Sequence, residues 1–309
     1  MPPYLRDLSQ RSLNTFWEIA RIMVPIMILM RLAESYGVIE WISPVLRPVM
    51  AVLNLPPEAA IVCLSSILTG IYGAIATLPV LIGHDLTGAQ VTSICAILLI
   101  AHAIPIEQAI VRRAGGSFWG TTLLRLFAAG LAAFLIDAAS KLTGFLAHPQ
   151  PLLHIAEFAR VDAGHFEWAV SSMKGMALLF LILIGLLIMM DAFDRFSVTN
   201  LINSLLAPVM RLSGLDRSVT SITTAGILLG LTYGGGLIIA QGSNPEISRK
   251  AKYYALCWLS LCHGLIEDLA LMVAIGGNFW VLFAGRIALT LVLVRALMGW
   301  HSLRSVGWQ

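Results

Sequence analysis

The chain has 309 residues, of which 58% are hydrophobic and 12% charged, and its formal net charge at pH 7 is +3. Soluble domains carry about a quarter charged residues, so this composition excludes an ordinary soluble domain and indicates an all-α polytopic membrane protein. The small net charge gives no reason to expect nucleic acid as a partner. The four cysteines lie in apolar segments, which predicts buried thiols and no disulfide framework.

The first half, residues 1–140, is predicted to hold five elements in the membrane. Its start is polar, so no cleaved signal peptide is expected. In chain order the elements are a crossing helix (15–33), an interfacial helix (38–53), a glycine-broken stretch (59–83), a helix interrupted by Pro105 (90–112) and a crossing helix (119–140).

A polar linker, residues 141–172, separates this half from a second membrane half, residues 173–309. The linker is too polar to cross a bilayer. The second half repeats the order, with a helix (174–190), an interfacial piece (196–212), a glycine-broken stretch (219–241), a helix (252–273) and a last crossing helix (279–299). The sequence therefore predicts two membrane repeats joined by one linker.

The two halves also match residue by residue. Residues 102–125 align with residues 263–286 without a gap, which pairs His102 with His263, Glu107 with Asp268 and Arg125 with Arg286. Duplicated membrane halves with ionisable residues at the repeat interface are typical of secondary transporters.

The basic residues favour an inverted arrangement of the halves. Arg112 and Arg113 follow the histidine helix of the first half, whereas the basic run at residues 249–252 precedes the histidine helix of the second. Cytoplasmic loops are rich in Lys and Arg, so these loops share a side only if the repeats are inverted. We therefore expect about six crossings and two re-entrant hairpins, with the linker outside and both termini in the cytoplasm. The expected location is the inner membrane of a bacterium. Eight crossings in parallel repeats remain the alternative.

The glycine-broken stretches provide the first candidate site residues. Re-entrant tips are tolerated only where they are buried in protein or line a wet cavity, and their glycines free backbone groups for a ligand. The paired tip residues are Tyr72 and Gly73 in the first half and Tyr233 and Gly234 in the second, and Thr232 adds a hydroxyl beside the second tip. The alternative is that these glycines only permit close helix packing.

Ionisable residues in the two histidine helices provide the second set. His102 and Glu107 are five residues apart, and the helix break expected at Pro105 brings the carboxylate toward the histidine. In the second half, His263 and Glu267 are four apart and predicted to share a helix face, with Asp268 one position further round. Such a group suits proton exchange, cation coordination or hydrogen bonding to a polar ligand.

A purely structural interpretation of the acids is also open. Arg125 and Arg286 lie on the following helices, and the pairs Glu107–Arg125 and Asp268–Arg286 could be ion pairs that only hold the halves together. The sequence has no metal-binding motif of real specificity, so we expect no metal site and no cofactor apart from a coupling proton or cation.

These features resemble the Gate, or "nucleoside recognition", membrane family. The residues that carry the resemblance are HAIPIEQAIV (102–111), HGLIEDLALM (263–272) and the glycine-rich stretches. The family includes spore maturation membrane proteins, and similar regions occur in ferrous-iron transporters and in the cores of concentrative nucleoside transporters. The resemblance implies an interfacial helix, a re-entrant hairpin, a broken helix and a full helix in each inverted half, with the substrate held between hairpin tips and broken helices.

The sequence thus favours a secondary transporter of a small polar solute, nucleoside-like or another polar metabolite, that works by alternating access. Two alternatives remain: a non-transporting membrane component that assembles with a partner protein, and a divalent-metal permeation pathway through His102, Glu107, His263 and Glu267. We expect no enzymatic activity, because no nucleophile–base pair is evident. Beyond the solute and the lipid, the expected partner is a second copy in a homodimer.

Overall fold

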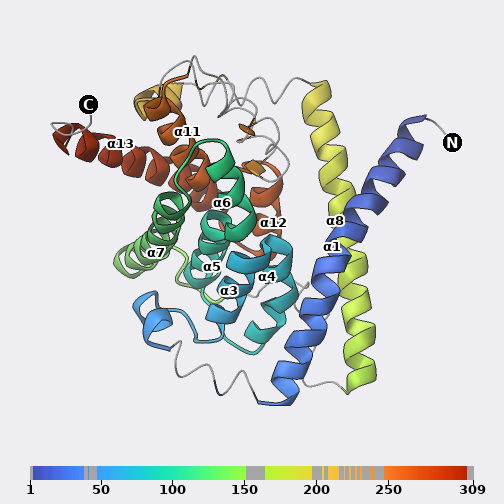
Figure 1. The fold of residues 1–309 in the computed structure, drawn as a ribbon. Coiled ribbons are helices and arrows are strands. Elements are labelled where there is room, and N and C mark those ends of the chain that lie inside the picture. The colour runs from blue at the N-terminus through green and yellow to red at the C-terminus, as the bar shows by residue number, and fades with distance from the viewer. Residues whose placement is uncertain are drawn as a thin grey trace.

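A computed structural model gives the arrangement of the chain (Figure 1). It describes residues 3–37, 41, 47–150, 164–196, 204, 208–215, 219, 223, 227, 230–231, 238–239 and 247–304. These residues form helices and no strand, apart from one isolated bridge between Thr87 and Pro149. The helical class predicted from composition is therefore confirmed.

Two long helices, α1 (Pro3–Ser35) and α8 (His165–Arg195), lie side by side along one flank (Figure 1). The rings of Phe16 and Phe180 pack with their centroids 4.9 Å apart, and Arg11 makes an ion pair with Asp191. Helix α8 begins at His165, so the segment predicted as polar linker already contains the first turns of this helix. Residues 151–163 of the linker lie outside the described residues.

The first glycine-broken stretch folds as two short helices, α3 (Ala59–Thr69) and α4 (Ile71–Thr77), followed by the 3₁₀ turn η1 (Leu78–Leu81). The break is Gly70, whose φ of 94° is costly for residues with a side chain. The second stretch, at 219–241, and the interfacial segment at 196–212 lie mostly outside the described residues. Of the interfacial segment at 38–53 the structure describes residue 41 and residues 47–53, of which 47–52 are helical. Membrane re-entry by these stretches stays a prediction.

The centre of the molecule is a broken helix made of α5 (Gly88–Ala101) and α6 (Ile104–Arg113). Thr87 begins α5 with a capping box, and nearly every residue of α5 is buried, so this helix is surrounded by others. The break falls at His102 and Ala103, and Ala103 adopts a left-handed conformation with φ 46°. Pro105 lies in the first turn of α6, where its missing N–H costs no hydrogen bond. The predicted break is confirmed.

A second broken helix consists of α11 (Arg249–Leu261) and α12 (Glu267–Ile275). The chain-order prediction of one continuous helix at 252–273, with His263 and Glu267 on a common face, is therefore wrong. The broken helix that the family resemblance implies for each half is present in both. The chain leaves the helix at Cys262 and turns at Gly264, whose φ is 58°. No proline marks this break, and a single glycine inside an apolar pattern did not reveal it.

Two further long helices complete the fold: α7 (Phe118–Thr143), and α13 (Arg286–Arg304) preceded by the π-helical turn η3 (Val281–Gly285). Four segments of the described chain are long and apolar enough to cross a membrane: Gly88–Arg113, Phe118–Thr143, His165–Gly185 and Val281–Trp300. The expected total of about six crossings remains a prediction.

Contacts within the two halves repeat at equivalent positions. The ring pairs Phe118–Trp119 and Phe279–Trp280 both have centroids 5.1 Å apart and an interplanar angle of 77°. The Gly116 N–H donates to Val111 O at 2.9 Å, and the equivalent Gly277 N–H donates to Met272 O at 2.9 Å. The duplication in the sequence is thus a duplication of local structure.

The two broken helices run antiparallel to each other. Thr92, near the start of α5, accepts a hydrogen bond from the N–H of Asn278, just after α12. At the other end, Gly116 and Gly120, which follow α6, lie against Leu256 and Tyr253 of α11. The start of each broken helix therefore lies beside the end of the other, and the two breaks meet between these ends.

Candidate functional site

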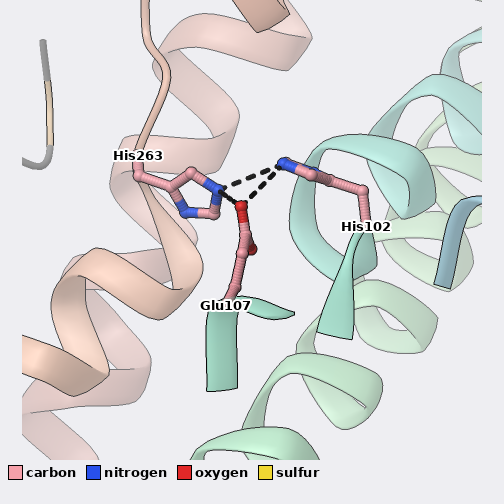
Figure 2. Close-up of side chains that lie close together, drawn as sticks. All are labelled: His102, Glu107 and His263. Atoms are coloured by element: carbon pink, nitrogen blue, oxygen red, sulfur yellow. Dashed lines mark hydrogen bonds and ion pairs between the residues drawn. The ribbon is translucent and has the colours of Figure 1, made fainter. Parts of the chain in front are cut away.

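The two equivalent histidines meet where the helices break (Figure 2). His102 Nε2 and His263 Nε2 are 3.2 Å apart, and the ring centroids are 4.9 Å apart. Only 6% of His102 and 1% of His263 is exposed. These two contacting residues are 161 positions apart, which is the offset at which the two halves of the sequence align.

The helix breaks determine how each imidazole is oriented. His102 Nδ1 lies 2.9 Å from Leu98 O, and His263 Nδ1 lies 2.7 Å from Leu259 O. These carbonyls are among the last of α5 and α11, where helix hydrogen bonds run out. Because a carbonyl only accepts, each Nδ1 carries a hydrogen, and each Nε2 of a neutral ring presents its lone pair to the centre.

Glu107 places one carboxylate oxygen between the two rings (Figure 2). Its Oε1 is 3.2 Å from His102 Nε2 and 3.2 Å from His263 Nε2. Its Oε2 forms an ion pair of 2.6 Å with Nη1 of Arg125. Both charges are almost fully buried, so this pairing is needed to offset their desolvation.

Arg125 also ties the end of α5 to the following helix. Its Nε donates to Ile100 O at 2.6 Å and its Nη2 donates to His102 O at 2.7 Å. The structure thus forms the first of the two ion pairs that the sequence left open, and the same arginine satisfies backbone carbonyls that the break leaves unpaired.

The second repeat departs from the first at this point. Arg286 donates from Nε to Leu261 O at 2.8 Å and from Nη2 to Leu99 O at 2.9 Å, while its buried Nη1 has no hydrogen-bond partner in the described chain. Asp268 instead places Oδ2 3.8 Å from His102 Nε2. The longer break before α12 leaves Asp268 in the first turn of its helix. Among the described residues Asp268 therefore pairs with His102, and the alternative of an Asp268–Arg286 ion pair equivalent to Glu107–Arg125 is not realised.

Glu267 connects the second broken helix to the first glycine-broken stretch. The hydroxyl of Tyr72, on α4, donates to Glu267 Oε1 at 3.1 Å. Gly73 lies buried in α4, where its carbonyl accepts from the Thr77 hydroxyl at 3.4 Å, a contact internal to that helix. The other predicted tip residues, Thr232, Tyr233 and Gly234, lie outside the described residues.

An apolar pocket lies beside the cluster formed by His102, His263 and Glu107, but this pocket does not suit a polar solute. Its volume is about 240 Å³, and it lies between α5, α7 and residues 281–289. Apart from Arg286 and Gly285, its lining is made of apolar side chains such as Leu99, Ile136 and Leu289. Polar ligands need convergent polar groups, so the histidine cluster is the better candidate site.

Sequence reasoning grouped His102, Glu107 and His263 only in the alternative of a divalent-metal pathway, and it did not predict the direct contact between the two histidines. It also missed the carbonyls of Leu98 and Leu259, whose role follows only from the helix breaks. One available signal was the alignment of His102 with His263, because a residue that recurs at equivalent positions is a candidate for the repeat interface.

Comparisons with known proteins place this site in a family context. Residues 16–118 match the family model Gate, which is described as nucleoside recognition. The chain is similar to "Uncharacterized membrane protein YvoD" of Bacillus subtilis (strain 168), with 24% identity over 294 residues that cover 92% of this chain and 90% of the relative. No solved structure matches the chain. The part of this integral membrane protein that is similar to the Gate family, residues 16–118, includes His102 and Glu107.

Proposed function

We propose that the protein is a secondary transporter of a small polar solute that works by alternating access and is coupled to a proton or a cation. The observation that carries this proposal is the contact of His102 with His263 at the breaks of two antiparallel helices. Buried ionisable groups at discontinuous helices between repeats are the usual location of substrate and coupling-ion sites in such transporters.

The antiparallel course of the broken helices supports inverted repeats. One of them, Gly88–Arg113, is long and apolar enough to cross the membrane. If both cross, opposite directions correspond to opposite topologies, which is the relation that the basic residues predict. Two inverted repeats can exchange their conformations, and this exchange opens a central site first to one side and then to the other.

The link between Tyr72 and Glu267 suits a gate in this mechanism. It joins α4 of the first repeat to the start of α12 in the second, and both side chains are only partly buried. A hydrogen bond between elements of different repeats must break or reform when the repeats move past each other. We therefore assign Glu267 to substrate or coupling-ion binding and Tyr72 to its positioning.

Uptake into proteoliposomes tests the proposal. We expect the purified full chain to accumulate at least one solute from a panel that begins with nucleosides, because the Gate family is described as nucleoside recognition. Accumulation should require an imposed proton or sodium gradient. Glu267→Gln should lower the initial rate about tenfold or more, since it removes the charge at a proposed coupling site while preserving shape.

The matched control is His84→Gln, which alters a half-exposed histidine beside Glu58, away from the breaks. It should transport at the wild-type rate. Wild-type uptake that is unchanged in Glu267→Gln would contradict the assignment. A folded wild-type chain that moves no solute and purifies with a stoichiometric partner protein would instead support the alternative of a non-transporting component.

A further inference from the structure

We propose that His102, His263 and Glu107 form a binding site for one divalent first-row transition-metal ion, which links the two repeats. The ligand atoms of these three residues all lie within 4.8 Å of one another. The proposal goes beyond transport, because a resident ion at this position would be bound at equilibrium whether or not a solute moves.

The three atoms that would bind the ion, Nε2 of each histidine and Oε1 of Glu107, direct their lone pairs toward one point. In each histidine, Nδ1–H donates a hydrogen bond to a backbone carbonyl, so Nε2 of a neutral ring carries no hydrogen and is an acceptor. The Glu107 carboxylate is an acceptor as well. Three acceptors in mutual contact repel unless a cation lies between them. Donation of the other ring N–H to a carbonyl is also the usual way in which metal-binding histidines are oriented.

The distances distinguish a metal ion from a shared proton. All three pairs among His102 Nε2, His263 Nε2 and Glu107 Oε1 are 3.2 Å apart. A proton shared with a carboxylate would shorten one pair to about 2.7–2.9 Å. A tetrahedral ion with bonds of about 2.0–2.1 Å holds its ligands about 3.3 Å apart, which fits all three pairs at once.

The surroundings supply a further ligand and a compensating charge. Asp268 Oδ2 is 3.8 Å from His102 Nε2, so a small movement of this side chain completes a fourth position. Arg125 engages only Oε2 of Glu107, which leaves Oε1 for the ion. Two arginines and three carboxylates lie in or beside the cluster: Arg125, Arg286, Glu107, Glu267 and Asp268. Their net charge is −1 when all are ionised, which favours entry of a cation.

The ligand set determines the class of metal. Two imidazoles and one carboxylate are typical ligands of Zn²⁺ and of non-haem Fe²⁺, and they also accept Mn²⁺ or Co²⁺. Mg²⁺ and Ca²⁺ prefer oxygen ligands alone. The sequence-based expectation of no metal site rested on the lack of a local motif, and these ligands come from segments that only the fold brings together.

Metal content of the purified full chain tests the inference. The detergent-solubilised protein is stripped with a chelator, loaded with Zn²⁺, desalted and analysed by mass spectrometry of the elements. We expect about one Zn²⁺ per chain, retained in excess Mg²⁺. His102→Gln and His263→Gln should each weaken Zn²⁺ binding at least tenfold, because loss of a ligand exceeds the loss of its supporting hydrogen bond. His84→Gln should match the wild type.

A spectroscopic measurement on the wild-type chain keeps the test independent of whether the variants fold. X-ray absorption at the zinc edge should give nitrogen and oxygen ligands at about 2.0–2.1 Å and no sulfur ligand. Failure of the wild type to retain Zn²⁺, equal loss in His84→Gln, or sulfur ligation by a cysteine would each overturn the site. Solute uptake by a chain that retains no metal would overturn this inference and leave the transport proposal intact.

Discussion

Single side chains hold the two helix breaks open in the same way. Arg125 and Arg286 each reach back from the following helix and donate Nε to the carbonyl of Ile100 or Leu261. A guanidinium at the carboxyl end of a helix also interacts favourably with the helix dipole. The breaks are therefore stabilised by buried arginines, and this explains why charged residues recur at equivalent positions inside an apolar chain.

The break at Gly264 depends on a glycine at this position. Its φ is 58°, and a Cβ there would overlap the carboxylate of Asp268. We predict that Gly264→Ala lowers the free energy of unfolding by about 1–3 kcal/mol, since an alanine is strained in this conformation and displaces Asp268. The measurement is the thermal unfolding midpoint of the purified chain in detergent.

Gly130→Ala is the matched control for this substitution. Gly130 lies inside α7 with open space around the position of a Cβ. Alanine is favoured over glycine in a helix by about 0.5–1 kcal/mol, so this variant should unfold at an equal or higher temperature. Equal midpoints for Gly264→Ala and the wild type would show that the break does not require glycine.

Individual site residues were predictable where they followed a local rule. Pro105 indicated that Glu107 would turn toward His102, and their side chains are 3.2 Å apart. The different roles of Glu107 and Asp268 were not predictable, because the alignment treats them as equivalent. Their difference arises from the unequal lengths of the two breaks, which depend on backbone conformation at Ala103 and Gly264.

At the scale of elements, α1 and α8 are connected by polar contacts at one end as well as by ring packing. Arg11 donates to both carboxylate oxygens of Asp191, at 3.0 and 2.7 Å, and the Tyr4 hydroxyl donates to the same carboxylate at 3.0 Å. These residues are partly exposed, so the contacts contribute modestly to stability. They fix how the amino-terminal part of α1 lies against the carboxyl-terminal part of α8.

This contact predicts a pH dependence of stability with a defined sign. The hydrogen bond from Arg11 lowers the pKa of Asp191 below its ordinary value. The stabilisation is therefore fully present above the unfolded-state pKa of about 3.9 and is lost as the pH falls through the lower folded-state pKa. Asp191→Asn should cost about 0.2–1 kcal/mol at pH 7 and progressively less below about pH 4.

The check is the difference in unfolding midpoint between wild type and Asp191→Asn, measured from pH 7 down to about pH 3. The control is Asp85→Asn, which changes an exposed carboxylate outside this helix pair. A difference between wild type and Asp191→Asn that stays constant over this range would mean that ionisation of Asp191 does not contribute to packing of α1 on α8.

At the scale of the whole molecule, the duplication was readable from the sequence, but the way the halves meet was not. Equivalent residues such as Phe118 and Phe279 recur in the alignment and in the structure. Apart from the contact of His102 with His263, contacts between halves such as that of Thr92 with Asn278 join residues that differ in type, and neither repeat alone shows a pattern that predicts them. Composition and periodicity indicate local burial, whereas packing between the repeats depends on the path of the backbone in both of them.

The antiparallel broken helices make a prediction about membrane topology. Arg112 at the end of α6 and Lys250 at the start of α11 are both exposed, whereas Asp85 precedes α5 and Phe279 follows α12. Single cysteines at these positions can be labelled with a membrane-impermeant maleimide in intact cells, because the four native cysteines are buried. Inverted repeats predict that Asp85→Cys and Phe279→Cys react from outside, while Arg112→Cys and Lys250→Cys react only after the membrane is permeabilised.

Each of the variants Arg112→Cys and Lys250→Cys keeps a basic neighbour, Arg113 or Arg249, so a basic residue still marks the loop as cytoplasmic. Parallel repeats with eight crossings would put Arg112 and Lys250 on opposite faces, and that labelling pattern would remove the basis for alternating access by exchange of the two halves.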